Sequence, residues 1–99
     1  MEDDEFEWRD PKAASNLLKH GVSFEMARET FKDAFAISRV ARGHDDFEER
    51  FVLLGMVENR LLFVSYTLRN DRIHIISARK AETHERRQYH NENRYDGEV

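Results

Sequence analysis

The chain has 99 residues, a formal net charge of −4 and no cysteine. This length suits one domain, residues 1–99, with a single modest core, and it is too short for two domains. The lack of cysteine excludes a disulfide framework and a thiolate metal site and fits a reducing compartment, so we expect a cytoplasmic protein. No apolar run approaches the roughly 18 residues of a membrane span, and we expect no membrane contact.

Charge is unevenly distributed along the chain. The first ten residues carry six acidic side chains and one arginine, and we expect residues 1–5 to form a flexible acidic tail. Residues 69–90, in contrast, carry six lysines or arginines and three acidic residues. Such runs are often solvated surface, but a basic segment in an acidic chain is also compatible with a local phosphate site.

Two short helices are predicted near the N-terminus. In RDPKAASNLLKHG, Asp10 is expected to be the N-cap, the following proline the first helical residue, and Gly21 the residue just past the end. Leu17 and Leu18 are expected on the apolar stripe of this helix. Within VSFEMARETFKD, Ser23 is expected to cap a second helix.

A sheet is predicted for the middle of the chain, where β-branched and aromatic residues alternate with polar ones. Four strands are expected, over residues 34–40, 50–57, 61–68 and 72–79. The short polar breaks between them favour antiparallel hairpins, and therefore a meander. A further short strand over residues 6–8 is possible.

Good helix formers after residue 81 predict a third helix that ends before Gly97. The fold class is therefore α+β: two N-terminal helices, a four-stranded antiparallel meander and a C-terminal helix, with the helices covering one face of the sheet. Strict alternation in RIHIISAR places Arg79 on the same side as Ile73 and Ile75, at a corner between strand and helix, and points His74 to the other side.

Three segments in the order FEWRDPKAASNLLKHGVSFEMARETFKD, EERFVLLG and IHIISARKAETHERRQY resemble the BrnT family of bacterial type II toxins, over residues 6–89. The resemblance implies a fold similar to the RelE-like microbial ribonucleases and RNA cleavage that inhibits translation. It also implies a neutralising partner similar to the BrnA antitoxins, which are DNA-binding proteins, in a hetero-oligomer with the toxin. The chain departs from the family pattern at Glu82, where threonine is common, and in its low net charge.

Metal-free RNA cleavage needs a base for the ribose 2′-hydroxyl, a cation for the phosphate and an acid for the leaving oxygen. Arg79 is the predicted centre of such a site, because its guanidinium can bind phosphate through two hydrogen bonds; the alternative is a structural ion pair with Glu85. Glu85 is a candidate base or an orienting partner of Arg79. Tyr89, four residues later on the same helical face, is either catalytic or half-buried packing.

Other candidates are less specific. Lys19 and His20 end the first helix, where they could serve in catalysis or simply complement the helix dipole. Arg50 begins a strand and could reach the same end of the sheet as Arg79, or pair with a neighbouring glutamate on the surface. Three further cations are expected to bind RNA: Lys80, Arg86 and Arg87.

The histidines form no recognisable metal motif, so we expect no metal and no cofactor. His74 and His84 are interpreted as surface groups, and His44 as a substrate contact or part of a turn. Asp45 and Asp46 are compatible with Mg²⁺ binding, as in any acidic loop.

Two functions of different classes follow. The first is a metal-independent endoribonuclease toxin of a type II toxin-antitoxin system, with the basic corner around Arg79 holding the scissile phosphate. The alternative is a non-catalytic protein-protein interaction module of an antitoxin-like complex, which the acidic net charge favours.

Overall fold

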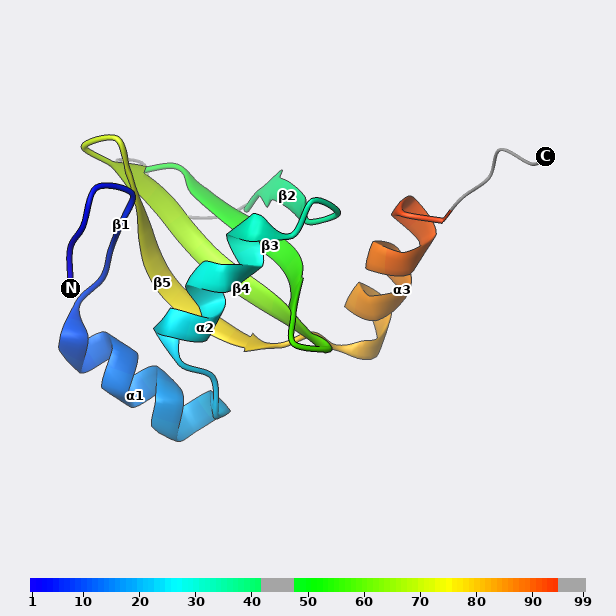
Figure 1. Ribbon diagram of the computed structural model, residues 1–99, viewed down its shortest axis with the longest axis horizontal. Coiled ribbons are helices and arrows are strands. Elements are labelled where there is room, and N and C mark those ends of the chain that lie inside the picture. Colours follow the sequence, from blue (N-terminus) through cyan, green and yellow to red (C-terminus); the bar gives the residue numbers. More distant parts are fainter. Residues whose placement is uncertain (42–47, 95–99) are drawn as a thin grey trace.

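A five-stranded sheet forms the middle of the molecule (Figure 1). The computed structural model describes residues 1–41 and 48–94. The elements in chain order are β1 (Phe6–Glu7), α1 (Asp10–His20), α2 (Phe24–Glu29), the 3₁₀ turn η1 (Thr30–Lys32), β2 (Ile37–Val40), β3 (Arg50–Val57), β4 (Arg60–Arg69), β5 (Arg72–Lys80) and α3 (Thr83–Glu92). The predicted α+β class is confirmed. No helix within the described ranges is long and apolar enough to cross a membrane.

Strands β2 to β5 form the predicted antiparallel meander. Each of the two tight hairpins turns through two residues with positive φ: Glu58 and Asn59 at 49° and 65°, and Asn70 and Asp71 at 51° and 64°. Left-handed conformations at both loop positions are typical of type I′ turns, whose twist suits the flanking strands. The polar breaks in the sequence therefore mark hairpins.

The prediction of a four-stranded, purely antiparallel sheet is wrong at one edge. The sheet order is β1-β5-β4-β3-β2, and β1 runs parallel to β5, with Phe6 opposite Ile73 and Glu7 opposite His74. A strand of two residues has no periodicity that could reveal its partner or its direction. The possible strand over residues 6–8 thus exists, and it brings the N-terminus beside β5.

Acidic residues ahead of β1 contact cations from later in the chain. Asp3 Oδ2 lies 2.7 Å from Arg28 Nη2 of α2, and the carbonyl of Asp3 accepts a hydrogen bond from Arg72 Nε at 2.6 Å. Asp3 Oδ1 also accepts hydrogen bonds from the backbone N–H groups of Phe6 and Glu5. Both hydrogen bonds lower the pKa of Asp3, and the one from Phe6 has the larger effect. Part of the N-terminal negative charge is thus paired within the fold.

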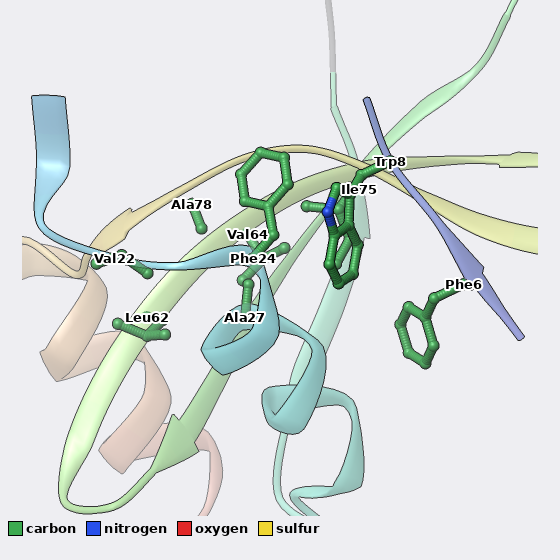
Figure 2. Packing of buried hydrophobic residues seen from close by; sticks show 9 residues of the cluster. All are labelled: Phe6, Trp8, Val22, Phe24, Ala27, Leu62, Val64, Ile75 and Ala78. Carbon is green, nitrogen blue, oxygen red and sulfur yellow. The ribbon is translucent and has the colours of Figure 1, made fainter. Parts of the chain in front are cut away.

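One face of the sheet, which we name the core face, carries the main hydrophobic core (Figure 2). Trp8 and Phe24 meet edge to face there, with ring centres 5.8 Å apart. The segment from α1 to α2 covers this face. The buried residues of the cluster are Phe6, Trp8, Val22, Phe24, Ala27, Leu62, Val64, Ile75 and Ala78.

The opposite face, which we name the outer face, contacts α3 at one end. Helix α3 lies at that end of the sheet (Figure 1). Tyr89 of α3 is buried there with Leu54 and Leu61 in a second, smaller cluster. The prediction that the helices cover one face is therefore wrong. The apolar side chains at this end of the outer face need their own cover, and α3 supplies it because it follows β5 directly.

A bulge interrupts the pairing of β4 with β5. Ser65 lies opposite Ser77, but the next residue of β4, Tyr66, lies opposite Ile75, so Ile76 is an extra residue in β5. An extra residue exchanges the two sides of a strand beyond it.

The bulge changes which residues share a side of β5. Ala78, not Arg79, returns to the core face beside Val64, where it is buried. Arg79 therefore points to the outer face, as His74 does on the other side of the bulge. The prediction that Arg79 shares a side with Ile73, and that His74 points away from it, is wrong because strict alternation does not hold through a bulge.

Helix α1 begins one residue earlier than predicted. Its N-cap is Arg9, and Asp10 is the first helical residue. Gly21 follows the helix with φ of 67°, a left-handed conformation that suits glycine, as predicted. Ser23 caps α2 by accepting a hydrogen bond from the backbone N–H of Met26 at 3.0 Å, which is also confirmed.

The predicted apolar stripe of α1 is wrong. Leu17 and Leu18 are 51% and 90% exposed, whereas Asn16 is buried. Asn16 Nδ2 donates to the carbonyls of Val22 and Ala78 at 3.0 and 2.8 Å, and Oδ1 accepts from the N–H of Ala78 at 3.2 Å. Because β1 pairs with only the first part of β5, the edge beyond it is open, and Asn16 satisfies its backbone groups there. Helix α1 thus packs on a strand edge.

Candidate functional site

Beyond α3, the outer face carries side chains in three rows across the strands. Residues paired across neighbouring strands point to the same side, so the register assigns each row. From the α3 end, the rows are Leu54, Phe63 and Arg79, then Val52, Ser65 and Ser77, then Arg50, Thr67, His74 and Glu7. The first and the third row lie about 13 Å apart along β4. Because the middle row is small, a hollow of about 300 Å³ lies over it, bordered by Phe63 and Arg50.

Arg79, the predicted centre, is held by Glu85 at the start of α3. Its Nη1 and Nη2 donate to Glu85 Oε1 and Oε2, each at 2.9 Å, and its guanidinium lies 4.2 Å from the centre of the Phe63 ring. The Glu85 side chain is only 7% exposed and also accepts a hydrogen bond from the backbone N–H of Glu82 at 2.8 Å. Burial alone would raise the Glu85 pKa, but these hydrogen bonds outweigh it and lower the pKa.

One edge of the Arg79 guanidinium stays unoccupied by protein acceptors in the described part of the chain. Arginine has five N–H groups. Two of them donate to Glu85, and a third, on Nη1, donates to the Lys80 carbonyl at 3.1 Å. The remaining Nε–H and Nη2–H lie side by side, in the fork geometry that binds two phosphate oxygens. The ion pair with Glu85 and a phosphate contact are therefore geometrically compatible.

Tyr89 makes a structural contact with the loop before β2. Its hydroxyl donates to Asp33 Oδ2 at 2.6 Å, and the same oxygen accepts from the backbone N–H of Met56 at 2.8 Å. Burial, and then the Asp33 carboxylate, raise the pKa of Tyr89 to about 12. The phenol proton of Tyr89 is therefore donated to Asp33 and is not directed at Glu85 or Arg79. Asp33 was not among the predicted site residues.

The other predicted cations separate into two places. Lys19 and His20 end α1 near the end of β5 that carries Arg79, since α1 follows the β5 edge with Asn16 beside Ala78. Neither has a hydrogen bond or ion pair to Arg79 within residues 1–41 and 48–94. The predicted RNA-binding residues are exposed at the end of β5 and on the first half of α3: Lys80, Arg86 and Arg87.

Arg50 lies at the opposite end of the sheet. Strands β3 and β5 run in the same direction, so the first residue of β3 lies in the row of His74 near the start of β5. Of the two alternatives for Arg50, the one in which it reaches the same end of the sheet as Arg79 is therefore wrong. Its Nε is buried and has no hydrogen-bond partner in the described ranges, because Glu48 pairs with Arg69 instead.

The interpretation of His74 as a surface group is wrong, whereas His84, with a side chain 72% exposed, does lie on the surface. His74 is 9% exposed. Its Nδ1 lies 2.8 Å from Glu7 Oε2 of β1, and its Nε2 lies 3.4 Å from Arg69 Nη1. A carboxylate only accepts and a guanidinium only donates, so these neighbours place the proton of the neutral ring on Nδ1 and leave a lone pair on Nε2.

A cleft of about 190 Å³ opens beside His74. Four cationic side chains from α1 or its N-cap, β3 and β4 line it together with the imidazole: Arg9, Lys12, Arg50 and Arg69. Sequence reasoning missed this group because its members come from distant segments and meet only through the sheet register. The one local signal was the double isoleucine in RIHIISAR, where the bulge lies.

One group of possible metal ligands occurs in the described residues. Ligand atoms of Glu82, His84 and Glu85 lie within 4.8 Å of one another. Both oxygens of Glu85 already accept hydrogen bonds from Arg79, so this carboxylate is poorly placed for a cation. The absence of a metal requirement stays a prediction. His44, Asp45 and Asp46 lie outside the described residues.

Comparison with known proteins assigns the family. Residues 8–85 match the family model described as "Ribonuclease toxin, BrnT, of type II toxin-antitoxin system". A comparison with curated proteins finds no significant match. The matched segment runs from Trp8 to Glu85, so it includes strands β2 to β5, the three rows apart from Glu7, and the Arg79–Glu85 pair. A type II system implies an antitoxin as partner. Since the match covers most of its length, the chain belongs to the BrnT family of ribonuclease toxins.

Proposed function

We propose that this toxin is a metal-independent endoribonuclease that binds RNA along the outer face of the sheet. The observation that carries the proposal is the arrangement of this face: Arg79 stands at one end, and Arg50 and Arg69 surround His74 at the other. Hollows of about 300 and 190 Å³ lie between and beside them. Cations with exposed hydrogen-bond donors on both sides of a small-residue row suit a polyanionic strand.

The proposed roles follow from the contacts of each residue. Arg79 offers the Nε and Nη2 edge of its guanidinium to a phosphate, while Glu85 holds it in place. Lys19 and His20 lie near that end of β5. Tyr89 anchors α3. Positive potential is extended over α3 by Lys80, Arg86 and Arg87.

We propose further that cleavage inhibits translation in the cytoplasm and that a DNA-binding antitoxin similar to BrnA neutralises the toxin in a hetero-oligomer. Membership of a type II toxin family supports an antitoxin of some kind, and a fold similar to the RelE-like ribonucleases would fit the small sheet with flanking helices.

Cleavage of RNA in the presence of EDTA tests the enzymatic proposal. The purified chain, without antitoxin, is incubated with total RNA and excess chelator, and we expect fragments. Arg79→Ala should lower kcat/KM on the order of ten- to a hundredfold per folded molecule, mainly by raising KM, because one contact to an RNA phosphate is lost. Leu18→Ser is the matched control, since Leu18 is 90% exposed.

The alternative, a non-catalytic interaction module, draws support from the net charge of −4. The interaction module predicts that no RNA fragments form under any condition and that the chain still binds the antitoxin tightly. Fragments that appear only when Mg²⁺ is added would contradict metal independence but keep the ribonuclease.

A further inference from the structure

We propose that His74 is the general base of RNA cleavage and that Glu7 is its positioning residue. The inference rests on the proposed ribonuclease function and adds a residue pair to it. Neither residue belongs to the basic corner at Arg79, and Glu7 lies ahead of the matched segment.

The position of His74 is set by four strands. Arg50, Thr67, His74 and Glu7 are register partners across β3, β4, β5 and β1, and they point to the outer face as one row. Glu7 Oε2, 2.8 Å from Nδ1, fixes the orientation of the ring and its proton. A base held by a sheet and oriented by a carboxylate is prepared to accept a proton at Nε2.

The Nε2 atom is available for a hydroxyl group. Its contact with Arg69 Nη1 is 3.4 Å long, beyond the usual range of a good hydrogen bond, so a ribose hydroxyl can replace it at small cost. Arg69 does not need this contact, because its Nε and Nη2 are bound to Glu48 at 2.6 and 3.0 Å. Its Nη1 is left to face a phosphate next to the base.

Arg50 adds a further cation to the same cleft. Its Nε is buried and has no hydrogen-bond partner in the described ranges. An unsatisfied buried donor destabilises the folded protein, and such groups are rare in native structures. Arg50 and Arg69 both line the cleft beside His74, with Arg9 and Lys12 on its α1 side. A phosphate bound in this cleft would lie among these four cations, beside the imidazole of His74.

The reaction balances with water as the only other participant. His74 Nε2 takes the proton of a ribose 2′-hydroxyl, and the 2′-oxygen forms a bond to the adjacent phosphorus while the bond from phosphorus to the 5′-oxygen breaks. The 5′-oxygen takes a proton from water, and the imidazolium returns its proton to the hydroxide formed. The products are a 2′,3′-cyclic phosphate and a 5′-hydroxyl end. Arg50 and Arg69 stabilise the negative charge that develops on the phosphate.

A purely structural role is the competing account. The pair of Glu7 and His74 also fastens β1 to the edge of β5, because the two residues are register partners. That account explains the Nδ1 contact, but it gives no reason for the cleft and the four cations on the Nε2 side.

The test compares His74→Ala and Glu7→Gln with wild type and with His84→Ala, which removes an exposed histidine on α3. Cleavage rates, KM, product ends and melting temperature are measured in EDTA. We expect His74→Ala to lose on the order of 10²- to 10³-fold in kcat with little change in KM, and added imidazole to restore part of the rate. Glu7→Gln should lose on the order of 10- to 100-fold, because the amide still accepts from Nδ1 but cannot stabilise the imidazolium. His84→Ala should behave as wild type.

Each outcome decides one point. Wild-type protein that leaves RNA intact overturns the proposed function. Wild type that cleaves, together with a folded His74→Ala protein of full activity, overturns the assignment of the base alone. A rate that falls only with the folded fraction and is not restored by imidazole favours the structural account. That result also overturns the assignment of His74 as the base. If His74→Ala does not fold, His74→Gln keeps a hydrogen-bond donor for Glu7, and the folded variant must be inactive for the proposal to stand.

Discussion

The two members of the Arg79–Glu85 pair are expected to contribute unequally to stability. Glu85 is 7% exposed and Arg79 is 31% exposed, so removal of the arginine leaves a charge that water barely reaches. We predict that Arg79→Ala loses about 3 kcal/mol of unfolding free energy. Glu85→Ala, which leaves a guanidinium near solvent, should lose about 1 kcal/mol. Urea unfolding of both variants measures this difference, and equal losses would contradict it.

Tyr89 makes a separate prediction about alkaline stability. Its pKa is raised from 10.0 to about 12 by burial and by Asp33, so the folded protein keeps a proton that the unfolded chain releases. The unfolding free energy should therefore fall as the pH rises through this window, and the Tyr89 contribution is fully present below it. Tyr89→Phe should be about 1 kcal/mol less stable at neutral pH and should lose this part of the alkaline decline. Urea unfolding of wild type and Tyr89→Phe at neutral pH and within the window from 10.0 to about 12 tests this. An unchanged alkaline decline in the variant would show that other groups cause the decline.

At the scale of elements, α1 is expected to depend on one polar residue and not on its leucines. Asn16 makes three hydrogen bonds to the backbone of Ala78 and Val22. Asn16→Ala leaves buried backbone groups of β5 unpaired, and we predict a loss of about 2 kcal/mol. Leu18→Ser, at a site 90% exposed, should change stability by less than about 0.5 kcal/mol. Thermal unfolding measures both, and amide exchange at Ala78 should accelerate only in Asn16→Ala. The reverse order of the two losses would contradict this account of α1.

At the scale of the whole molecule, an acidic protein is expected to bind RNA through one face. If the four cations of the cleft contact phosphates, the affinity for RNA should fall with salt with a logarithmic slope of about 3. Lys12→Glu should weaken binding strongly. Lys32→Glu changes the net charge equally, but Lys32 lies on η1, which follows α2 on the core face, so it should have little effect. Titration with a substrate that lacks the attacking 2′-hydroxyl measures affinity without cleavage, and equal effects of the two variants would favour a response to net charge alone.

Much of the local structure could be predicted from the sequence, because its causes are local. Alternation and β-branched residues place β3 at residues 50–57 as observed, and polar pairs form the two hairpin turns. Ser23 caps α2 through a bond to a residue three positions later. At the candidate site, the sequence offers an ion pair of Arg79 with Glu85 as one of two alternatives, since only five residues separate the two in the chain.

The sequence by itself therefore determined the three helices, the meander and the nearness of Arg79 to Glu85, since each depends on residues close together in the chain, although β2 begins at Ile37 and not at residue 34. Only the tertiary structure decided the parallel β1, the side taken by α3 and the cleft around His74. These depend on pairing over long separations, as between Glu7 and His74. One extra residue, Ile76, moves Arg79 to the other face of the sheet, and no periodic pattern shows it. Side-chain direction beyond a bulge follows from the hydrogen-bond register, which exists only once the strands have met.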